Sequence, residues 1–552
     1  MDVINRKRGV MIKKVIIENY RIFKTFSFEP KDDFNVLVGE NGAGKSTVIE
    51  AINLALTGRV NGHWIQDELN PYLFNLSCTK DFFASAQNPD TANLVLPEIL
   101  IEVWLDDEES EYAELRGANN SDGREHAGIG LHIFPDPDSL GEFNEYIRQD
   151  GIPHIIPTEY YTYEWFDFSG KNLHRRPQCL PLYIVDSQKI IHYSGIDFFT
   201  RDMLNNNVDE ATKRSISSEV RKGRSQISES VLLPINEQLR KDDPSSALSL
   251  QMDQSASADW SNFVIPSIKQ LPFSMSGSGQ QTLLKAEFAV RKQKEKTLIL
   301  VEEPENNLSH TALLELLGMF RSQASQHHQF IVTTHSAFVL NRLGLDNLFL
   351  IKNGSINKIN NLSASTVKFF QRISGVDTLR FVLAKHSVLV EGPSDEMVFN
   401  WTFKKLFGQE PRDAGIDVIT FGIRGKRILE LAKALNADAA IIRDNDGEDP
   451  EHWKAEAAKF LEKDKRELFI GEDTSDNTLE PQMVTANENN LQVFAHEIGY
   501  PKTFDTRDSL IAWMKKNKTD WAWNFAKTES NEQFEAPEYM KEAANFIHGK
   551  LQ

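Results

Sequence analysis

The stretch Gly39-Glu40-Asn41-Gly42-Ala43-Gly44-Lys45-Ser46 follows the apolar run 34–38 and precedes a helical pattern from Ser46 to Leu56. It fits the P-loop pattern in the context that the pattern requires, between a buried strand and a helix. Glycines let backbone N–H groups surround phosphates, and the start of the helix adds its dipole. We expect Lys45 to reach the β- and γ-phosphates of ATP and Ser46 to hold Mg²⁺. The nucleotide-binding residues predicted here are Gly39, Asn41, Gly42, Gly44, Lys45, Ser46 and Thr47.

Two further strand ends carry residues suited to nucleotide hydrolysis. The apolar run 298–301 ends in Glu302 and Glu303, and the run 330–334 ends in His335. We expect Glu302 to hold Mg²⁺ through water and Glu303 to orient or activate the attacking water. His335 then acts as a sensor of the γ-phosphate. An acidic strand end alone is often a solvated loop, but Pro304-Glu305 and a later histidine strand make chance less probable than function.

The segment Ser276-Gly277-Ser278-Gly279-Gln280-Gln281 lies before a helix predicted from Thr282 to Val290. Together with the P-loop, the acidic strand and the histidine strand, it resembles the signature segment of the ABC/SMC class of ATPases. In that class the signature serves the nucleotide of the other subunit, so that ATP closes a dimer. Ser278, Gly279 and Gln280 are the residues implied, although the segment departs from Leu-Ser-Gly-Gly-Gln and two alignments one residue apart stay open.

Two other positions resemble elements of this class. A turn predicted from Glu18 to Phe23, after the strand-like segment 12–17, contains Arg21 and resembles the arginine loop that touches nucleotide. Gln66 is either a Q-loop glutamine or a surface residue. A transporter ATPase is the natural rival in this class, but no apolar run approaches the roughly 18 residues that a membrane span requires.

A second set of acidic strand ends follows in the C-terminal third. The run 388–390 ends in Glu391 and is followed by Asp395, and the run 441–442 leads to Asp444 and Asp446. Because alternate residues of an extended segment point the same way, we expect Asp444 and Asp446 to share one metal ion. This order of motifs on parallel strands is typical of a TOPRIM domain.

An ABC-type ATPase followed by Val-Glu-Gly-x-x-Asp and Asp-x-Asp-Gly resembles the OLD (overcoming lysogenization defect) nucleases, from Ile12 to about Lys527. That family includes the Gabija nuclease subunit and retron effectors. The resemblance implies two Mg²⁺ or Mn²⁺ ions, one held by Glu391 and Asp395 and the other by Asp444 and Asp446. It also implies a later acidic ligand, Glu480, and a lysine that neutralises charge on the phosphate, Lys518 with Lys527 as the alternative. Arg424, Lys426 and Arg427 lie beside the expected metal site, where they either hold a DNA backbone or belong to an ordinary solvated face.

Composition limits the compartment and the kind of nucleic-acid contact. The chain has 552 residues, a net charge of -19 and only two cysteines, Cys78 and Cys179. So few cysteines exclude a disulfide framework and favour a reducing, cytoplasmic location. The acidic charge opposes broad coating of DNA, since non-specific affinity depends on lysine and arginine near phosphates. A nuclease that binds divalent metals remains compatible with it.

The predicted fold class is α/β, with an ABC/SMC-type P-loop ATPase head, a helical insertion and a C-terminal Rossmann-like TOPRIM domain. The expected boundaries are 1–196 for the first ATPase part, 197–262 for the insertion as a possible dimerisation element, 263–383 for the second ATPase part and 384–552 for TOPRIM.

The leading hypothesis is an ATP-regulated DNA endonuclease or nickase acting in anti-phage defence. The resemblance implies a homodimer or higher oligomer and, for a retron effector, a reverse transcriptase with its msDNA, or another defence-system protein, as partner. The alternative is an ATP-driven DNA clamp whose TOPRIM domain does not cut. Topoisomerase and primase are minor alternatives, because no cleavage domain with a tyrosine nucleophile and no template platform is recognisable.

Overall fold

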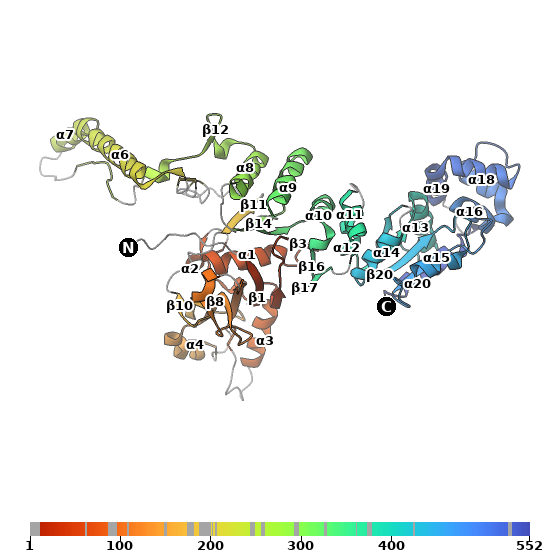
Figure 1. Cartoon of the computed structure of the whole chain (residues 1–552), viewed down its shortest axis with the longest axis horizontal. Coiled ribbons are helices and arrows are strands. Elements are labelled where there is room, and N and C mark those ends of the chain that lie inside the picture. Colours follow the sequence, from red (N-terminus) through yellow and green to blue (C-terminus); the bar gives the residue numbers. More distant parts are fainter. Residues whose placement is uncertain are drawn as a thin grey trace.

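The computed structural model describes residues 11–60, 63–86, 96–107, 110–147, 149, 152–173, 182–186, 200, 203–204, 207–242, 249–255, 260–291, 297–324, 328–359, 362–372, 378–422, 425–527 and 533–551. Residues 1–10, Cys179 and Arg424 lie outside these ranges. A central two-sheet part carries a helical arm on one side and a second α/β part on the other (Figure 1). Among the described residues, no helix has the length and apolar character needed to cross a membrane.

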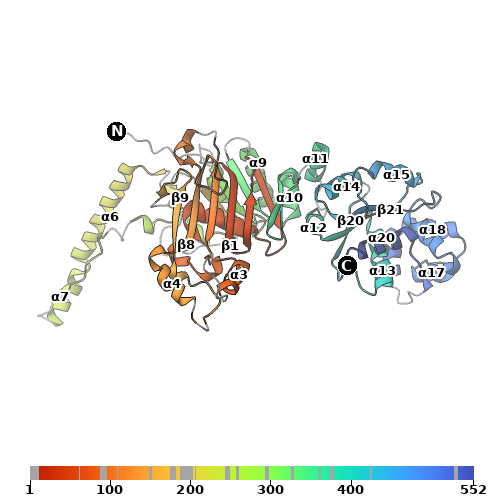
Figure 2. The same cartoon turned by 90° about the horizontal axis from the view of Figure 1, so that it is seen from below.

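An antiparallel sheet with the strand order β10-β9-β8-β6-β1-β2 forms one layer of the central part, and β7 pairs with β8. Its strands are β1 (Ile12–Tyr20), β2 (Phe23–Phe28), β6 (Ile99–Leu105), β7 (Arg116–Gly117), β8 (His126–Pro135), β9 (Tyr161–Asp167) and β10 (Asn172–Leu173). The turn expected over Glu18–Phe23 is wrong in extent: β1 continues to Tyr20, so only Arg21 and Ile22 make the turn. Figure 2 shows this sheet from below.

The second layer is a sheet with the order β11-β14-β15-β3-β16-β17, in which all strands except β17 are parallel. Its strands are β3 (Phe34–Gly39), β11 (Leu182–Asp186), β14 (Thr297–Glu302), β15 (His328–Thr333), β16 (Leu348–Lys352) and β17 (Ser355–Lys358). Carboxyl ends of parallel strands meet at one edge of a sheet. The P-loop at the end of β3, the acidic pair at the end of β14 and His335 after β15 therefore come together, although they are far apart in the sequence.

Helix α1 (Lys45–Thr57) packs between the two sheets, and its buried face belongs to the same core as β1, β6 and β8. The opposite face of the parallel sheet is covered by α8 (Ser278–Arg291), α9 (His310–Ala324) and α10 (Ala337–Leu343). Because both faces of the sheet are covered, β3 and β15 are buried along their whole length, including the polar residues Asn35 and Gln329.

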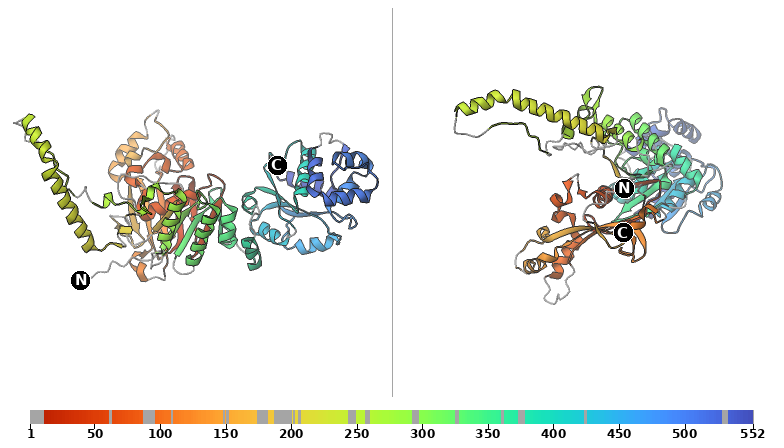
Figure 3. Two further views of the ribbon diagram at one scale, coloured as in Figure 1. Left: turned by 90° about the horizontal axis from the view of Figure 1, so that it is seen from above. Right: turned by 60° about the vertical axis from the view of Figure 1, so that its left-hand side comes forward.

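A helical arm of α6 (Glu210–Ser230) and α7 (Leu233–Asp242) projects from the central part, away from the C-terminal part (Figure 3). Its residues fall within the insertion expected at 197–262, and the four boundaries drawn from sequence stay a proposal.

The C-terminal part contains a parallel sheet with the order β19-β18-β20-β21. Its strands are β18 (His386–Val390), β19 (Ile416–Thr420), β20 (Asp438–Arg443) and β21 (Arg466–Ile470). Helices α13 (Pro393–Phe407), α19 (Lys518–Lys527) and α20 (Glu538–His548) share a core with one face, and α14 (Gly425–Ala434) and α15 (Pro450–Ala457) cover the other. The strand order reverses between β18 and β20, and such a switch point is where open α/β sheets bind ligands.

Two short helices, α11 (Ala364–Arg372) and α12 (Thr378–Leu383), connect the central and C-terminal parts. The Glu430 carboxylate on α14 accepts hydrogen bonds from Thr366 Oγ1 at 2.6 Å and from Ser363 Oγ at 3.1 Å. Arg380 on α12 pairs with Asp417 on β19 at 2.8 Å. One hydrophobic core runs through both parts at this junction. The connection is therefore a packed interface.

Candidate functional site

The P-loop wraps tightly because two of its glycines adopt left-handed backbone conformations. Gly42 has φ 78° and Gly44 has φ 105°. A Cβ on Gly44 would also lie 2.5 Å from the Phe23 ring, so only glycine fits there. Lys45 is buried at the start of α1, and its Nζ donates hydrogen bonds to Gly39 O and Glu40 O, each at 3.0 Å. Burial lowers the pKa of Lys45, against the opposing effect of Glu303 and Glu305.

Arg21 stands at the two-residue turn between β1 and β2 with φ 49°. Its guanidinium contacts Glu50 of α1, with 2.6 Å from Nε to Oε1 and 2.9 Å from Nη2 to Oε2. The Tyr20 hydroxyl donates to the same carboxylate. Arg21 is thereby fixed beside the P-loop helix.

The carboxylate of Glu303 is held by partners on two sides. Asn306 Nδ2 donates to Oε2 at 2.6 Å, and His335 Nε2 lies 3.2 Å from Oε1. The backbone of Glu303 turns out of β14 with φ 43°. Glu305, which the sequence did not single out, accepts a hydrogen bond from the His335 backbone N–H at 2.7 Å. Glu305 therefore positions the histidine loop.

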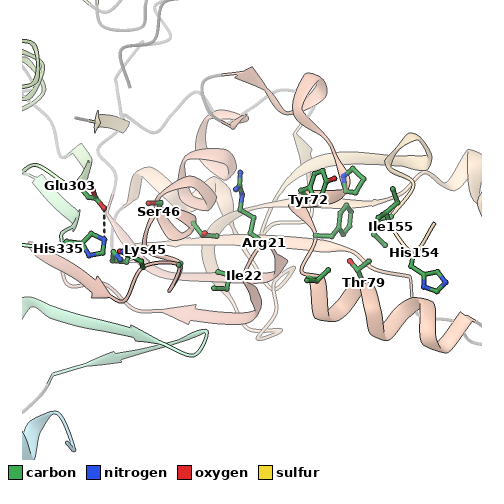
Figure 4. Close-up of a pocket in the computed structure, with 18 residues that line it drawn as sticks. Arg21, Ile22, Lys45, Ser46, Tyr72, Thr79, His154, Ile155, Glu303 and His335 are labelled. Carbon is green, nitrogen blue, oxygen red and sulfur yellow. Dashed lines mark ion pairs between the residues drawn. The ribbon is translucent and has the colours of Figure 1, made fainter. Parts of the chain in front are cut away.

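A cavity of about 680 Å³ contains most of the predicted nucleotide-binding residues (Figure 4). The predicted residues in its wall are Arg21, Asn41, Gly42, Gly44, Lys45, Ser46, Thr47, Glu303 and His335. Gly39 and Glu302 do not line it, nor does Gln66, which is exposed on α2 (Ile65–Glu68). The remaining wall comes from Ile22 and from the segments 71–79 and 154–156, and these two segments contain no motif that could have pointed to them.

Ser278, Gly279 and Gln280 lie apart from this cavity and form the first turn of α8. The expectation that they belong to a loop before a helix at Thr282 is wrong, because the helix begins at Ser278. The buried Gln281 side chain donates to Ser276 O at 2.8 Å and so holds the preceding turn. A Cβ on Gly279 would come within 2.6 Å of Asn307 O, which explains the glycine by close packing against the segment after the acidic pair.

Four carboxylates gather at the switch point of the C-terminal sheet. Glu391 follows β18 and Asp444 follows β20. Asp395, in the first turn of α13, accepts a hydrogen bond from Gly392 N at 3.0 Å. Glu480, in the first turn of α16 (Leu479–Ala486), accepts one from Thr478 Oγ1 at 2.7 Å. Asp395 and Glu480 are both buried.

These carboxylates interact because they are neighbours, with Asp395 and Glu480 buried and Glu391 and Asp444 half-buried. Burial, followed by the neighbouring acids Asp395, Glu391 and Glu480, raises the pKa of Asp444 to about 8. Burial is also the main reason that the pKa of Glu391 is raised to about 7 and that of Asp395 to about 6. The Asp444 Oδ1 atom is buried without a hydrogen-bond partner. This part of the fold therefore favours a bound cation.

Arg443 is a cation that sequence reasoning missed. Its Nη2 lies 2.9 Å from Asp446 Oδ2 and its Nε 3.5 Å from Glu391 Oε1, while its guanidinium stacks 3.5 Å from the centre of the Trp453 ring. The premise that Asp444 and Asp446 lie on one extended segment is wrong, because Asp446 sits in a turn with φ 54°. A strand-end arginine gives no sign in sequence of which acids it will meet.

Asn445 and Tyr539 make hydrogen bonds that hold the structure next to the carboxylates in place. The fully buried Asn445 donates to Gly471 O at 2.9 Å and Asp473 O at 2.8 Å, which fixes the turn between the two aspartates. Tyr539 of α20 donates to Gln482 Oε1 at 2.6 Å. Burial and then the nearby acids, Asp444 first, raise the pKa of Tyr539 well above its ordinary value. This tyrosine therefore stays protonated as a structural donor.

Lys518 lies beside the acidic residues, and its positive charge counteracts the rise in the pKa of Glu391 and of Asp395. Its backbone carbonyl accepts a hydrogen bond from Ser394 Oγ at 3.0 Å. Lys527 lies at the other end of α19, with Nζ 4.3 Å from the centre of the Trp523 ring. Of these two lysines, the fold thus brings Lys518 to the carboxylates.

A second cavity, of about 940 Å³, opens beside the carboxylates and includes Glu391, Arg443 and Asp446 in its wall. Lys426 and Arg427 line it as well. Across the described ranges, no three histidine, cysteine, aspartate or glutamate side chains converge closely enough to hold a metal ion as they stand. The acidic residues are therefore neighbours, but their side chains are not arranged around a single point.

Comparison with protein families identifies two regions. Residues 14–327 match the model of an AAA domain, which covers more than half of the chain. Residues 382–446 match the TOPRIM domain of overcoming lysogenization defect protein-like sequences. Glu480 and Lys518 lie beyond that second match.

Curated relatives match only a short stretch. A DNA double-strand break repair Rad50 ATPase of Methanopyrus kandleri is 50% identical over 60 residues, which are 10% of this chain and 7% of the relative. A DNA replication and repair protein RecF of Chlorobium phaeovibrioides is 40% identical over 42 residues, 8% of this chain and 11% of the relative. The chain thus spans a small fraction of the length of these relatives.

Solved structures resemble separate parts of the chain. The Smc head domain from Pyrococcus furiosus covers 63% of this chain and 95% of its own, at 14% identity and a TM-score of 0.34. The C-terminal region of the Xanthomonas campestris OLD protein covers 30% of this chain and 96% of its own, at 18% identity and a TM-score of 0.25.

Proposed function

Because the chain belongs to the AAA-domain family and is an ATPase–TOPRIM protein of the OLD family, we propose that it is an ATP-regulated, divalent-metal-dependent DNA endonuclease or nickase. The observation that carries this proposal is the set of buried carboxylates at the switch point of the TOPRIM sheet. Among them, the unpartnered Asp444 Oδ1 requires a cation or a proton. A DNA phosphodiester needs such a site, since its own negative charge must be offset for attack to occur.

The donor set fits Mg²⁺ or Mn²⁺, because these ions prefer oxygen ligands. We assign Glu391 and Asp395 to one ion and Asp444 and Asp446 to the other, with Glu480 as a further acidic ligand. Bound ions supply Lewis-acid activation of the phosphate and a more acidic water. Lys518 offsets charge that develops on the phosphate. For both ions to bind, Arg443 must release the Glu391 and Asp446 carboxylates.

The ATPase part supplies the control. We assign Lys45, Ser46 and Thr47 to the triphosphate and its Mg²⁺, Glu302 to a water ligand of that Mg²⁺, and Glu303 to the attacking water. Ser278–Gln280 lie outside the cavity that contains the P-loop, which supports a role toward the nucleotide of a second copy. ATP would then close a homodimer through the heads.

We infer the biological role of the protein from its resemblance to the OLD family. We place the protein in anti-phage defence, with DNA as substrate. A reverse transcriptase with its msDNA, or another defence-system protein, is the proposed partner. The relatives named for DNA repair, Rad50 and RecF, support contact with DNA.

One observation favours a second candidate, an ATP-driven DNA clamp with a TOPRIM part that does not cut. Arg443 already provides a positive charge to Glu391 and Asp446, as a permanent substitute for metal would. In this alternative, DNA binding and ATP turnover are unchanged by Glu391→Ala.

Cleavage of supercoiled plasmid separates the two candidates. The purified full chain is incubated with Mg²⁺, Mn²⁺ or EDTA, with and without ATP, beside Lys45→Ala. We expect nicked or linear product with metal and none with EDTA, and a change in rate in the Lys45→Ala lanes. ATP hydrolysis without cleavage under every condition, with the proposed partner also present, would favour the clamp.

Metal binding is expected to depend on pH. Because the pKa of Asp444 is raised to about 8, the folded metal-free protein retains a proton that the unfolded chain loses near its ordinary value of 3.8. This proton stabilises the folded protein fully below pH 3.8, and that stabilisation is lost as the pH rises to about 8. Mg²⁺ must displace the proton, so its affinity rises up to about tenfold per pH unit in that range. Thermal unfolding should therefore show a larger Mg²⁺-induced increase in Tm at pH 8 than at pH 6. An equal increase at both values would contradict this.

A further inference from the structure

The cavity that contains the P-loop has an apolar end beyond Arg21. Ile22, Tyr72, Leu76 and Ile155 line this end, and all four belong to the large apolar side chains that stay exposed in the described residues. The Tyr72 side chain is the most open, since 85% of its residue surface is exposed. Figure 4 shows Tyr72 and Ile155 on the side of Arg21 away from Lys45. We call these four residues the apolar end.

Exposed apolar residues are common when scattered singly. Here they gather in the wall of one cavity, and that cavity continues to the P-loop lysine. The polar neighbour Thr79 also lines the cavity, and its hydroxyl is satisfied by donating to Asn75 O at 3.0 Å. The cavity thus combines a cationic end rich in backbone donors with an aromatic, apolar end.

The backbone that carries Tyr72 is held in place by hydrogen bonds. Tyr72 belongs to the short helix η1 (Pro71–Leu73), and its backbone N–H donates to Asn70 Oδ1 at 3.0 Å. The same segment is bonded to the arginine turn, since Arg21 N donates to Leu73 O at 2.7 Å and Asn75 Nδ2 to Arg21 O at 2.8 Å. An exposed ring on a segment fixed by these bonds is suited to receive a flat ligand without reorganisation.

We propose that the apolar end is the nucleobase subsite and that the Tyr72 ring stacks on the base of the bound nucleotide. A nucleoside triphosphate has the same polarity as the cavity, with charge at one end and an aromatic face at the other. This inference rests on the proposed function, because the P-loop must hold the triphosphate. Stacking of one base on an aromatic side chain corresponds to roughly a 5- to 150-fold gain in affinity.

Titration calorimetry of the full chain with Mg²⁺ tests the subsite. ATP and inorganic tripolyphosphate are compared for the wild type, Tyr72→Ala and Tyr72→Phe, with Phe263→Ala as an exposed aromatic control outside the cavity. We expect Tyr72→Ala to weaken ATP binding roughly 5- to 150-fold and to leave tripolyphosphate binding unchanged. Tyr72→Phe and Phe263→Ala should bind both ligands like the wild type.

Two results overturn the inference. Unchanged ATP affinity in Tyr72→Ala excludes stacking, and if the ATP-dependent dimer is lost in the same variant, the apolar end belongs to an interface with a second copy. An equal loss for ATP and tripolyphosphate points to a distorted P-loop instead of a base subsite. Lys45→Ala separates this from the proposed function: if it binds both ligands like the wild type, the P-loop assignment itself fails, whatever Tyr72 does.

Discussion

Glu303→Gln is expected to lower the rate of ATP turnover by about two to four orders of magnitude while ATP still binds. Glutamine keeps the size of the side chain and the hydrogen-bonding reach toward Asn306, but it cannot take a proton from water. The carboxylate it replaces lines the same cavity as Lys45 and lies 3.2 Å from His335 Nε2. A general base needs this kind of fixed position near the reacting water.

The measurement is ATP hydrolysis under single- and multiple-turnover conditions, together with ATP affinity. Glu315→Gln is the matched control. Glu315 is exposed on α9 and lies outside the cavity, so this substitution makes the same chemical change away from the site. Its turnover should equal that of the wild type. Turnover in Glu303→Gln within threefold of the wild type would show that another group activates the water.

Asp444→Asn is expected to reduce metal-dependent DNA cleavage by at least about 10³-fold, because the loss of a charged metal ligand removes several kcal/mol of transition-state stabilisation. The same substitution is not expected to lower the stability of the fold. In metal-free protein at pH 8, a neutral amide avoids both the cost of burying a charge and the repulsion from neighbouring carboxylates, which together raise the pKa of Asp444. The Tm of Asp444→Asn should thus equal or exceed that of the wild type.

This combination distinguishes a lost catalytic site from a damaged fold. Asp464→Asn is the control, because it is the same substitution in the same part of the chain. Asp464 is exposed and adopts φ 60°. This variant should cut DNA normally. Full cleavage by Asp444→Asn, or a Tm several degrees below that of the wild type, would remove Asp444 from the proposed metal site.

The sequence predicts most strongly where a motif and its secondary structure come from the same local segment. The P-loop lies between β3 and α1, and Glu391 follows β18, because apolar runs and glycines specify these transitions locally. The helix start at Ser278 is not predicted, because it depends on a contact with a residue distant in sequence. Ser-Gly-Ser-Gly favours a loop by propensity, but packing of Gly279 against Asn307 O overrides that propensity.

The contacts of the two sites depend on residues distant in sequence. Arg443 meets Glu391 only because β20 lies next to β18, and no pattern in either strand encodes that neighbour. Tyr539 approaches the carboxylates from a helix almost a hundred residues beyond Asp444, as the sequence numbering shows. Tyr72 joins the cavity through hydrogen bonds to the arginine turn. A single sequence contains the residues of these contacts, but pairing them requires the topology.

The packed junction at α11 and α12 has a consequence for how such proteins diversify. Phe381 and Val382 on α12 share a continuous core with Ile428 and Leu431 on α14. Recombination that joined a new TOPRIM part just after residue 383 would separate α12 from α14 and expose apolar residues of this core. The unit that can be exchanged between relatives therefore includes residues 364–383, and substitutions there are expected to co-vary with those on α14.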